Sequence, residues 1–249
     1  MFPLRDSLPR YGVPWVVWAL ILVNTLAFLW LSDLPPQAQQ WVLYHLALVP
    51  ARYVDPAWAL AHGLGPGNPL PFFTNMFLHG GWFHLIGNMW TLWIFGPALE
   101  DRMGSWRFLV FYLLCGLFAS LTHFYFNATS IVPALGASGA IAGVIGGYAL
   151  LFPHARIILL VPILFIPYFF ELPAILFAGI WYFLQLLQGT TSLFAPRMGG
   201  GVAWWAHVGG FVAGIGLVRL FVVGRQRTWY PDEGVYGFLP DGRRGPKSQ

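Results

Sequence analysis

The stretch Gly136-Ala137-Ser138-Gly139-Ala140 places a serine between small residues at the start of an apolar run that continues to about Phe152. Small neighbours leave room for another backbone to approach the serine hydroxyl, and the unpaired N–H groups at the start of a helix favour negative charge. Serine among small residues is also common where helices pack in membranes. Taken alone, this stretch favours tight helix packing over a reactive serine.

The composition indicates an integral membrane protein. Of the 249 residues, 57% are hydrophobic and only 9% are charged, whereas a soluble domain carries about 25% charged residues. The net charge of +4 is compatible with nucleic acid, but the arginines cluster at the ends of apolar runs, as membrane topology requires. The single cysteine, Cys115, excludes an internal disulfide and a Cys-rich metal site, so we interpret it as a helix-packing residue.

Six apolar segments approach the ~20 residues that a membrane-spanning helix needs. They are 14–31, 82–99, 106–126, 137–152, 171–187 and 204–223. The first follows Arg5 and Arg10 but lacks a small-residue cleavage site, so we expect an uncleaved helix rather than a signal peptide. The apolar segment 157–170 contains Pro162 and Pro167. We expect interfacial backbone there, and a seventh span is the alternative.

The positions of the arginines predict that both termini are cytoplasmic. In that orientation the outer loops hold only Arg52 and Arg197 of the 13 Lys and Arg residues. We therefore expect a cytoplasmic N-terminus (1–13), a six-helix domain (14–223) and a cytoplasmic, disordered tail (224–249) in a prokaryotic-like plasma membrane. The long first outer loop, 32–81, is apolar enough to be partly embedded in the membrane.

Polar side chains inside spans are costly and therefore indicate function. Three of the predicted spans run from outside to inside, and they place His84, Ser138 and His207 near their outer ends at similar depth. Asn88 follows His84 by four residues, so both lie on one helix face. Small residues at Ala206, Gly210 and Gly214 would bring the span of His207 close to that of Ser138.

These residue types suit peptide hydrolysis. Ser138 needs a base as it attacks, and the imidazole of His207 is suited to that task. No acidic residue is placed to orient His207, which predicts a Ser–His dyad rather than a triad. His84, Asn88 and the Ser138 backbone N–H are candidate donors to an oxyanion.

Each candidate residue has a structural alternative. Helix packing explains the glycines around His207 but not the histidine, so that position favours function. His84 and Asn88 fit cross-helix hydrogen bonding equally well. His79 indicates a structural loop end, and His123 fits either role. A zinc site from His79, His84 and His123 has neither His-Glu-x-x-His spacing nor a carboxylate partner.

Taken together, the motifs resemble those of rhomboid intramembrane serine proteases. The matching pieces are 76–89 (MFLHGGWFHLIGNM), 136–140 (GASGA) and 206–210 (AHVGG) with Gly214, and Glu100-Asp101-Arg102 resembles the turn after the family's second helix. The resemblance implies an all-α, six-helix bundle that cleaves transmembrane segments of other membrane proteins, with a small residue before the scissile bond. It also implies Ser138 as nucleophile, His207 as base, and His84 and Asn88 in the oxyanion hole, without cofactor or metal.

Two departures from the family pattern affect the expected site. Many relatives carry a Trp-Arg pair in the first outer loop, which the stretch 68–71 lacks. Some relatives place an aromatic residue one turn after the serine, where this chain has Ala142. Another group must therefore hold His207.

Two other functions are compatible with this sequence. The first is a non-catalytic rhomboid-like protein that binds unstable transmembrane helices, and the second is a transporter. The lack of mid-span carboxylates and internal repeats weighs against the transporter. The expected partners are transmembrane substrates and the lipid bilayer, with no nucleic acid, and the oligomeric state is open.

Overall fold

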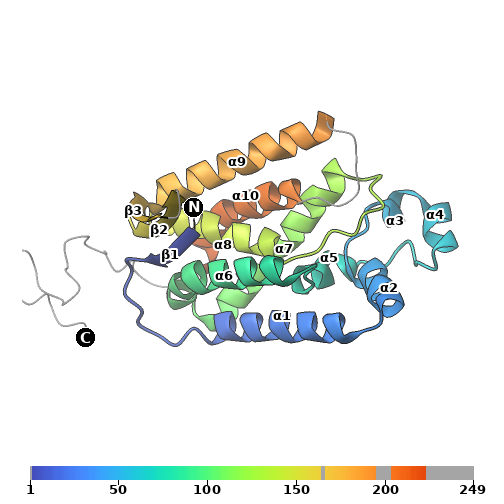
Figure 1. Ribbon diagram of the computed structural model, residues 1–249, viewed down its shortest axis with the longest axis horizontal. Coiled ribbons are helices and arrows are strands. Elements are labelled where there is room, and N and C mark those ends of the chain that lie inside the picture. Colours follow the sequence, from blue (N-terminus) through green and yellow to red (C-terminus); the bar gives the residue numbers. More distant parts are fainter. Residues whose placement is uncertain (1, 164–165, 195–202, 223–249) are drawn as a thin grey trace, which may run out of the picture.

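The computed structural model describes residues 2–163, 166–194 and 203–222. Long helices form a bundle that has a small sheet at one end and a group of short helices at the other (Figure 1). The long helices are α1 (Trp15–Asp33), α6 (Trp82–Met103), α7 (Ser105–Phe126), α8 (Ser138–Leu151), α9 (Ala174–Phe194) and α10 (Trp204–Phe221). The predicted cytoplasmic tail, 224–249, lies outside the described residues.

Each predicted span overlaps one long helix, and the bounds differ by up to seven residues. Among the described residues, four helices (α1, α7, α9 and α10) are long and apolar enough to cross a membrane, and α8 is a shorter apolar helix. The chain is therefore a multi-pass membrane protein. The full count of six spans stays a prediction, because α8 has only 14 residues and α6 continues through the charged residues 100–102.

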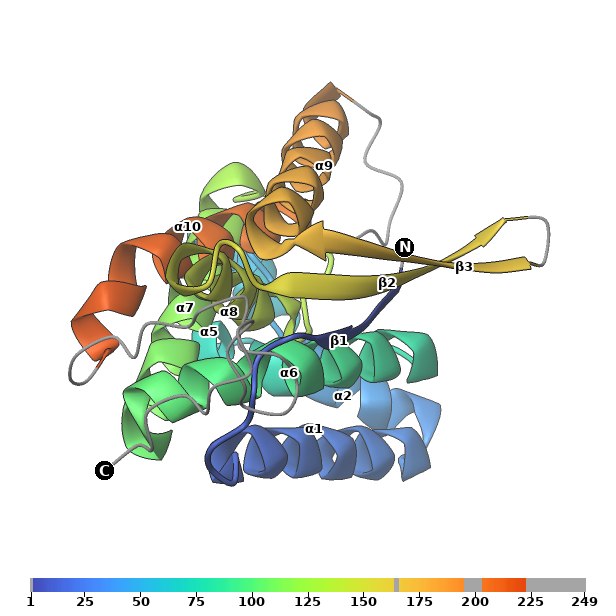
Figure 2. The same cartoon turned by 90° about the vertical axis from the view of Figure 1, so that its left-hand side faces the viewer.

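An antiparallel sheet occupies the region where the sequence predicted interfacial backbone. Strands β2 (Arg156–Ile163) and β3 (Ile166–Pro173) form a hairpin, and β1 (Phe2–Asp6) pairs with the other edge of β2. Figure 2 shows the hairpin reaching sideways past the helices. The expectation of an all-α fold was wrong in this respect.

The composition of the hairpin explains why it is extended. Its two prolines disfavour a helix, since each removes a backbone donor and crowds the preceding turn. Pro162 and Pro167 instead pair opposite each other beside the turn. The β-branched residues Ile157, Ile158 and Val161 favour strands. Because the segment is apolar on both faces, no alternation of polar and apolar residues marked it as a strand.

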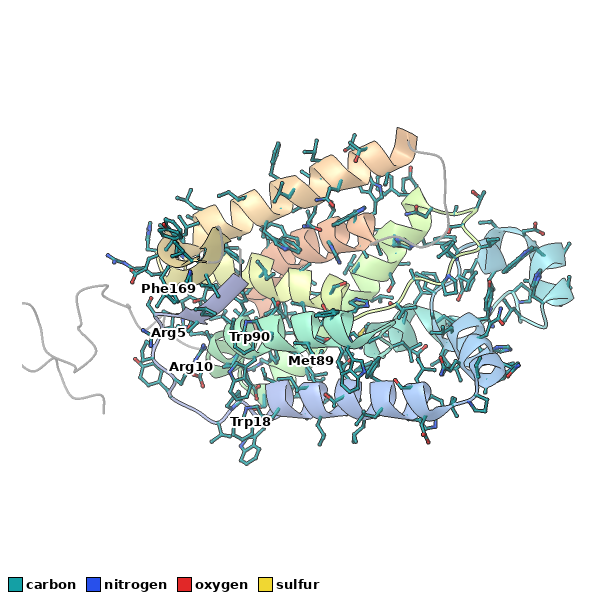
Figure 3. All side chains as sticks on the ribbon, viewed as in Figure 1. Arg5, Arg10, Trp18, Met89, Trp90 and Phe169 are labelled. Carbon is teal, nitrogen blue, oxygen red and sulfur yellow. The ribbon has the colours of Figure 1, made fainter. Side chains whose placement is uncertain are left out.

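The N-terminal segment is anchored to the bundle at the sheet end. The buried Asp6 carboxylate accepts a 2.7 Å hydrogen bond from the Tyr148 hydroxyl of α8 and forms a 2.8 Å ion pair with Arg10. Trp90 of α6 donates its indole N–H to the Pro3 carbonyl at 2.6 Å. Figure 3 shows Arg10 and Trp90 at this end of the molecule. Strand β1 is thereby attached to both central helices, α6 and α8.

The first outer loop folds into short helices at the opposite end of the bundle (Figure 1). They are α2 (Pro36–Leu46), α3 (Ala51–Val54), α4 (Pro56–Ala61), α5 (Pro71–Thr74) and the 3₁₀ turn η1 (Asn75–Phe77). Arg52 is only 2% exposed, and its guanidinium donates to the carbonyls of Gly65 at 2.7 Å and His45 at 3.3 Å. Arg52 therefore anchors this loop, although the Trp-Arg pair is missing at 68–71.

A buried carboxylate joins the helices at the sheet end. Glu100 of α6 accepts hydrogen bonds from the backbone N–H groups of Val16 and Val17 at 3.0 and 2.9 Å and from the Ser105 hydroxyl at 2.6 Å. The N–H groups at the start of α1 have no partner within that helix, so the carboxylate satisfies them and complements the helix dipole. Glu100 thus connects α1, α6 and α7.

Glu100→Ala is expected to lower the free energy of unfolding by about 2–3 kcal/mol, since it removes charge-assisted hydrogen bonds from a buried site. Unfolding of the purified protein by SDS in mixed micelles measures this change. The matched control is Glu171→Ala, which breaks the exposed ion pair with Arg156 and should cost less than about 1 kcal/mol. Equal losses in the two variants would contradict the capping role of Glu100.

Candidate active site

Glycines allow α8 and α10 to approach until their backbones touch. A Cβ atom at Gly210 would overlap the carbonyl oxygen of Gly139, and one at Gly214 would overlap that of Gly143. Ala206 also lies next to Gly139. The ridge of small residues therefore packs α10 against α8, as the sequence predicted. Any larger side chain at these positions would force the two helices apart.

This close packing brings Ser138 and His207 into contact. Ser138 is the first residue of α8, and its Oγ lies 2.7 Å from Nε2 of His207 on α10. His207 is buried, whereas Ser138 is partly exposed. The distance is within the range of a nucleophile that is hydrogen-bonded to its base.

Gln185 of α9 contacts the other side of the His207 ring. Its Oε1 lies 2.7 Å from Nδ1 of His207, and its Nε2 donates to the Trp181 carbonyl at 3.3 Å. Because a carbonyl only accepts, the second bond identifies which end of the amide is nitrogen. The amide oxygen then requires a hydrogen on Nδ1, which leaves Nε2 free to accept the serine proton.

Aromatic rings complete the surroundings of His207. The ring centroids of Trp181 and Trp204 lie 5.8 and 6.0 Å from that of His207. These contacts and the Gln185 bond fix the position of the imidazole. They take over the role of the aromatic residue that some relatives have at the position of Ala142. Gln185 was not among the predicted site residues, because only an acidic side chain was expected to be able to orient His207. The available signal was a polar amide within an apolar span.

The loop before Ser138 lies against the other two candidates. Gly136 has φ = 128°, and a Cβ atom there would lie 2.6 Å from Nε2 of His84 and 3.7 Å from Nδ2 of Asn88. The backbone N–H of Gly136 donates to the Asn75 carbonyl at 2.9 Å. The site thus needs glycine at 136 both for the backbone angle and for the close approach of His84.

His79 supports Asn88 from the loop before α6. Its side chain is 1% exposed, and its Nε2 lies 3.0 Å from Nδ2 of Asn88. The rings of His79 and His84 meet edge to face at 5.1 Å between centroids. His79 was predicted to be a structural loop-end residue, and its hydrogen bond to Asn88 fits that role.

A small cavity of about 20 Å³ lies beside Ser138. Its polar lining includes Asn75, Ser120 and His123, and Asn75 donates to the Ser120 hydroxyl at 2.9 Å. A cavity of this size is large enough for one water molecule. Among the described residues, no group of three or more His, Cys, Asp or Glu side chains is arranged to hold a metal ion.

Comparison with known proteins identifies related chains. A family model described as a rhomboid domain matches residues 66–224. Mitochondrial rhomboid protein 1 of Saccharomyces cerevisiae is 33% identical over 146 residues, which cover 57% of this chain and 38% of the relative.

Two further relatives come from a plant and a bacterium. RHOMBOID-like protein 5 of Arabidopsis thaliana is 28% identical over 159 residues, covering 55% of this chain and 52% of its own. Rhomboid protease GluP of Bacillus subtilis is 46% identical over 73 residues, which cover 29% of this chain and 14% of the relative. The chain spans less than two thirds of the length of each of these three relatives.

Gly136→Ala is expected to lower the free energy of unfolding by about 1–3 kcal/mol, because alanine is strained at this φ and its Cβ would displace His84. Thermal unfolding of the purified protein in detergent reports the loss. Gly67→Ala is the matched control, since a Cβ at Gly67 would have nothing within 4 Å. A Gly136→Ala variant as stable as Gly67→Ala would show that His84 does not need this close approach.

Proposed function

The chain belongs to the rhomboid family, and on that premise we propose that it is an intramembrane serine endopeptidase that cleaves transmembrane segments of other membrane proteins. The observation that carries the proposal is the 2.7 Å hydrogen bond between Ser138 Oγ and His207 Nε2. A serine hydroxyl is a weak nucleophile until a base removes its proton during attack. Here the base is positioned with the correct nitrogen facing the hydroxyl.

The reaction follows the chemistry of acyl transfer. Ser138 Oγ bonds to the scissile carbonyl carbon as His207 Nε2 takes the hydroxyl proton, and the carbonyl oxygen becomes an oxyanion. Collapse of this intermediate breaks the C–N bond, and His207 returns the proton to the leaving amine. Water then attacks the acyl-enzyme with His207 again as base, which releases the second product and restores Ser138.

His84, Asn88 and the Ser138 backbone N–H stabilise the oxyanion. His84 and Asn88 both lie against Gly136, two residues before the nucleophile, so they face the side of the site where a scissile carbonyl would sit. The Ser138 N–H belongs to the first turn of α8, where backbone donors are free. Donors aimed at developing charge lower the barrier most where water is excluded.

We further propose that six helices span the membrane, within a domain of residues 14–223, and that both termini are in the cytoplasm of a plasma membrane. The arginine distribution supports this orientation. It places Ser138 in the outer half of the bilayer, where the 20 Å³ cavity beside it supplies a polar place for the hydrolytic water. The crowded, glycine-rich site favours a substrate with a small residue before the scissile bond.

Ser138→Ala and His207→Ala are each expected to lower kcat for a model transmembrane substrate by at least about 10,000-fold. Each variant removes one member of the proposed nucleophile–base pair, and the two members act together. Purified variants in detergent are compared with wild type by gel-based cleavage. Ser32→Ala and His62→Ala are matched controls, because the Ser32 hydroxyl donates to the Phe28 carbonyl of its own helix and His62 is an exposed residue after α4.

Cleavage by both site variants at wild-type rates would reject the proposed reaction. Substrate binding without cleavage in the wild type, unchanged in Ser138→Ala, would favour the alternative of a non-catalytic protein that binds unstable transmembrane helices.

Asn88→Ala is expected to lower kcat by about 100- to 1,000-fold with little change in KM, as removal of one oxyanion donor does elsewhere. Steady-state cleavage in detergent separates the two constants. His79→Ala serves as the comparison, because it removes the support of Asn88 but leaves the amide, and we expect a smaller loss of kcat. A rise in KM at constant kcat in Asn88→Ala would assign Asn88 to substrate binding instead.

A further inference from the structure

We propose that Gln185 of α9 is a positioning residue that sets the tautomer and orientation of His207. The inference rests on the proposed function, since it concerns the base of that reaction. It changes the expected Ser–His dyad into a three-residue chain in which a neutral amide takes the place of an acid. Its three members come from α8, α10 and α9.

The burial of Gln185 indicates a specific role. Its side chain is 6% exposed within a helix that is otherwise apolar enough to span a membrane. A buried amide is costly unless its polar atoms are paired. Both ends are paired here, the oxygen with His207 and the nitrogen with the Trp181 carbonyl. A leucine at this position would satisfy helix packing without that cost.

The Gln185 bond should strengthen as the reaction proceeds. When His207 accepts the Ser138 proton on Nε2, the ring becomes positively charged while the hydrogen on Nδ1 stays in place. The Nδ1–H bond to the amide oxygen is then charge-assisted and stronger than in the resting enzyme. An interaction that strengthens in the transition state raises kcat rather than lowering KM.

The contact also makes the base depend on a peripheral helix. Figures 1 and 2 show α9 at the edge of the bundle, inclined to the helices beside it. A cavity of about 330 Å³ lies along α9, lined by Phe177 and Trp181 of α9, Trp90 of α6 and Ile145 of α8. Packing on this side of α9 is therefore loose, and the Gln185 amide is a directional link between α9 and the site.

The central experiment compares Gln185→Met, which keeps the length of the side chain but cannot bond Nδ1, with Gln185→Glu, which restores an acceptor. For Gln185→Met we expect kcat to fall about 10- to 100-fold, as loss of a hydrogen bond to a charged group would produce, with KM changed less than about twofold. Gln185→Glu should recover most of the lost kcat.

Gln188→Met is the matched control, because Gln188 lies on the same helix, is only partly buried, and is not among the described hydrogen-bond partners of the His207 ring, which are Gln185 and Ser138. Its kcat and KM should equal those of wild type. Equal kcat in wild type and Gln185→Met would overturn the inference. A loss of kcat in Gln185→Met that Gln185→Glu does not recover would also overturn it. Such a loss would come from altered side-chain packing rather than from the missing hydrogen bond to Nδ1.

A spectroscopic readout tests the contact without substrate. In ¹⁵N NMR of histidine-labelled protein, neutral His207 of the wild type should carry its hydrogen on Nδ1, and Gln185→Met should show a mixture of the two tautomers. A wild-type His207 protonated on Nε2 would overturn the inference even if Gln185→Met does not fold. Cleavage by Ser138→Ala would reject the proposed function while the tautomer measurement still tests Gln185.

Discussion

The close packing of α8 against α10 is the constraint on which the rest of the site depends. The carbonyl oxygens of Gly139 and Gly143 on α8 occupy the space that side chains at positions 210 and 214 of α10 would need. Lipid does not drive helices together as water drives apolar surfaces together, so association in a membrane depends on close van der Waals packing and polar contacts. Only glycine at 210 and 214 permits this approach, which brings Ser138 within hydrogen-bond distance of His207.

Three buried polar groups link elements of the bundle, because each bonds a group on another element. Glu100 satisfies the start of α1, the Asp6 carboxylate pairs with Tyr148 and Arg10, and Gln185 bonds His207. An unpaired polar group is far more costly in a low-dielectric interior than in water. Such pairs therefore determine which faces of the helices meet, whereas apolar contacts alone would tolerate rotation.

The candidate site combines rigid and adjustable parts. Ser138 lies on α8, whose residues 139–149 are all buried, so its hydroxyl is held by the centre of the bundle. The imidazole of His207 is held from two sides, by the backbone of α10, on which it lies, and by the Gln185 amide of α9. An imidazole constrained in this way needs no carboxylate for orientation, because a neutral acceptor can fix the same tautomer. The site is thus compatible with a membrane interior in which a buried carboxylate would be expensive.

Much of this protein follows from the order of its residues. The lengths of the apolar runs determined where the long helices lie, because a run of a given length can satisfy its backbone in lipid only as a helix. Ser138 and His207 could be predicted as candidates because polar residues in such runs are rare, and the structure brings their side chains into contact. The spacing of the small residues Ala206, Gly210 and Gly214 predicted which helix would meet α8.

Other features were decided only by the tertiary structure. The pairing of β1 with β2 and the contact between Gln185 and His207 depend on partners far away in the sequence, and the anchoring by Arg52 depends on how the outer loop folds back on itself. Gln185 precedes His207 by 22 residues. A polar residue within the apolar helix α9 signals a specific role, but the sequence does not show which residue it bonds. That partner depends on how α9 is rotated and inclined against α10. Local sequence does not determine this geometry, because it results from packing of the whole bundle.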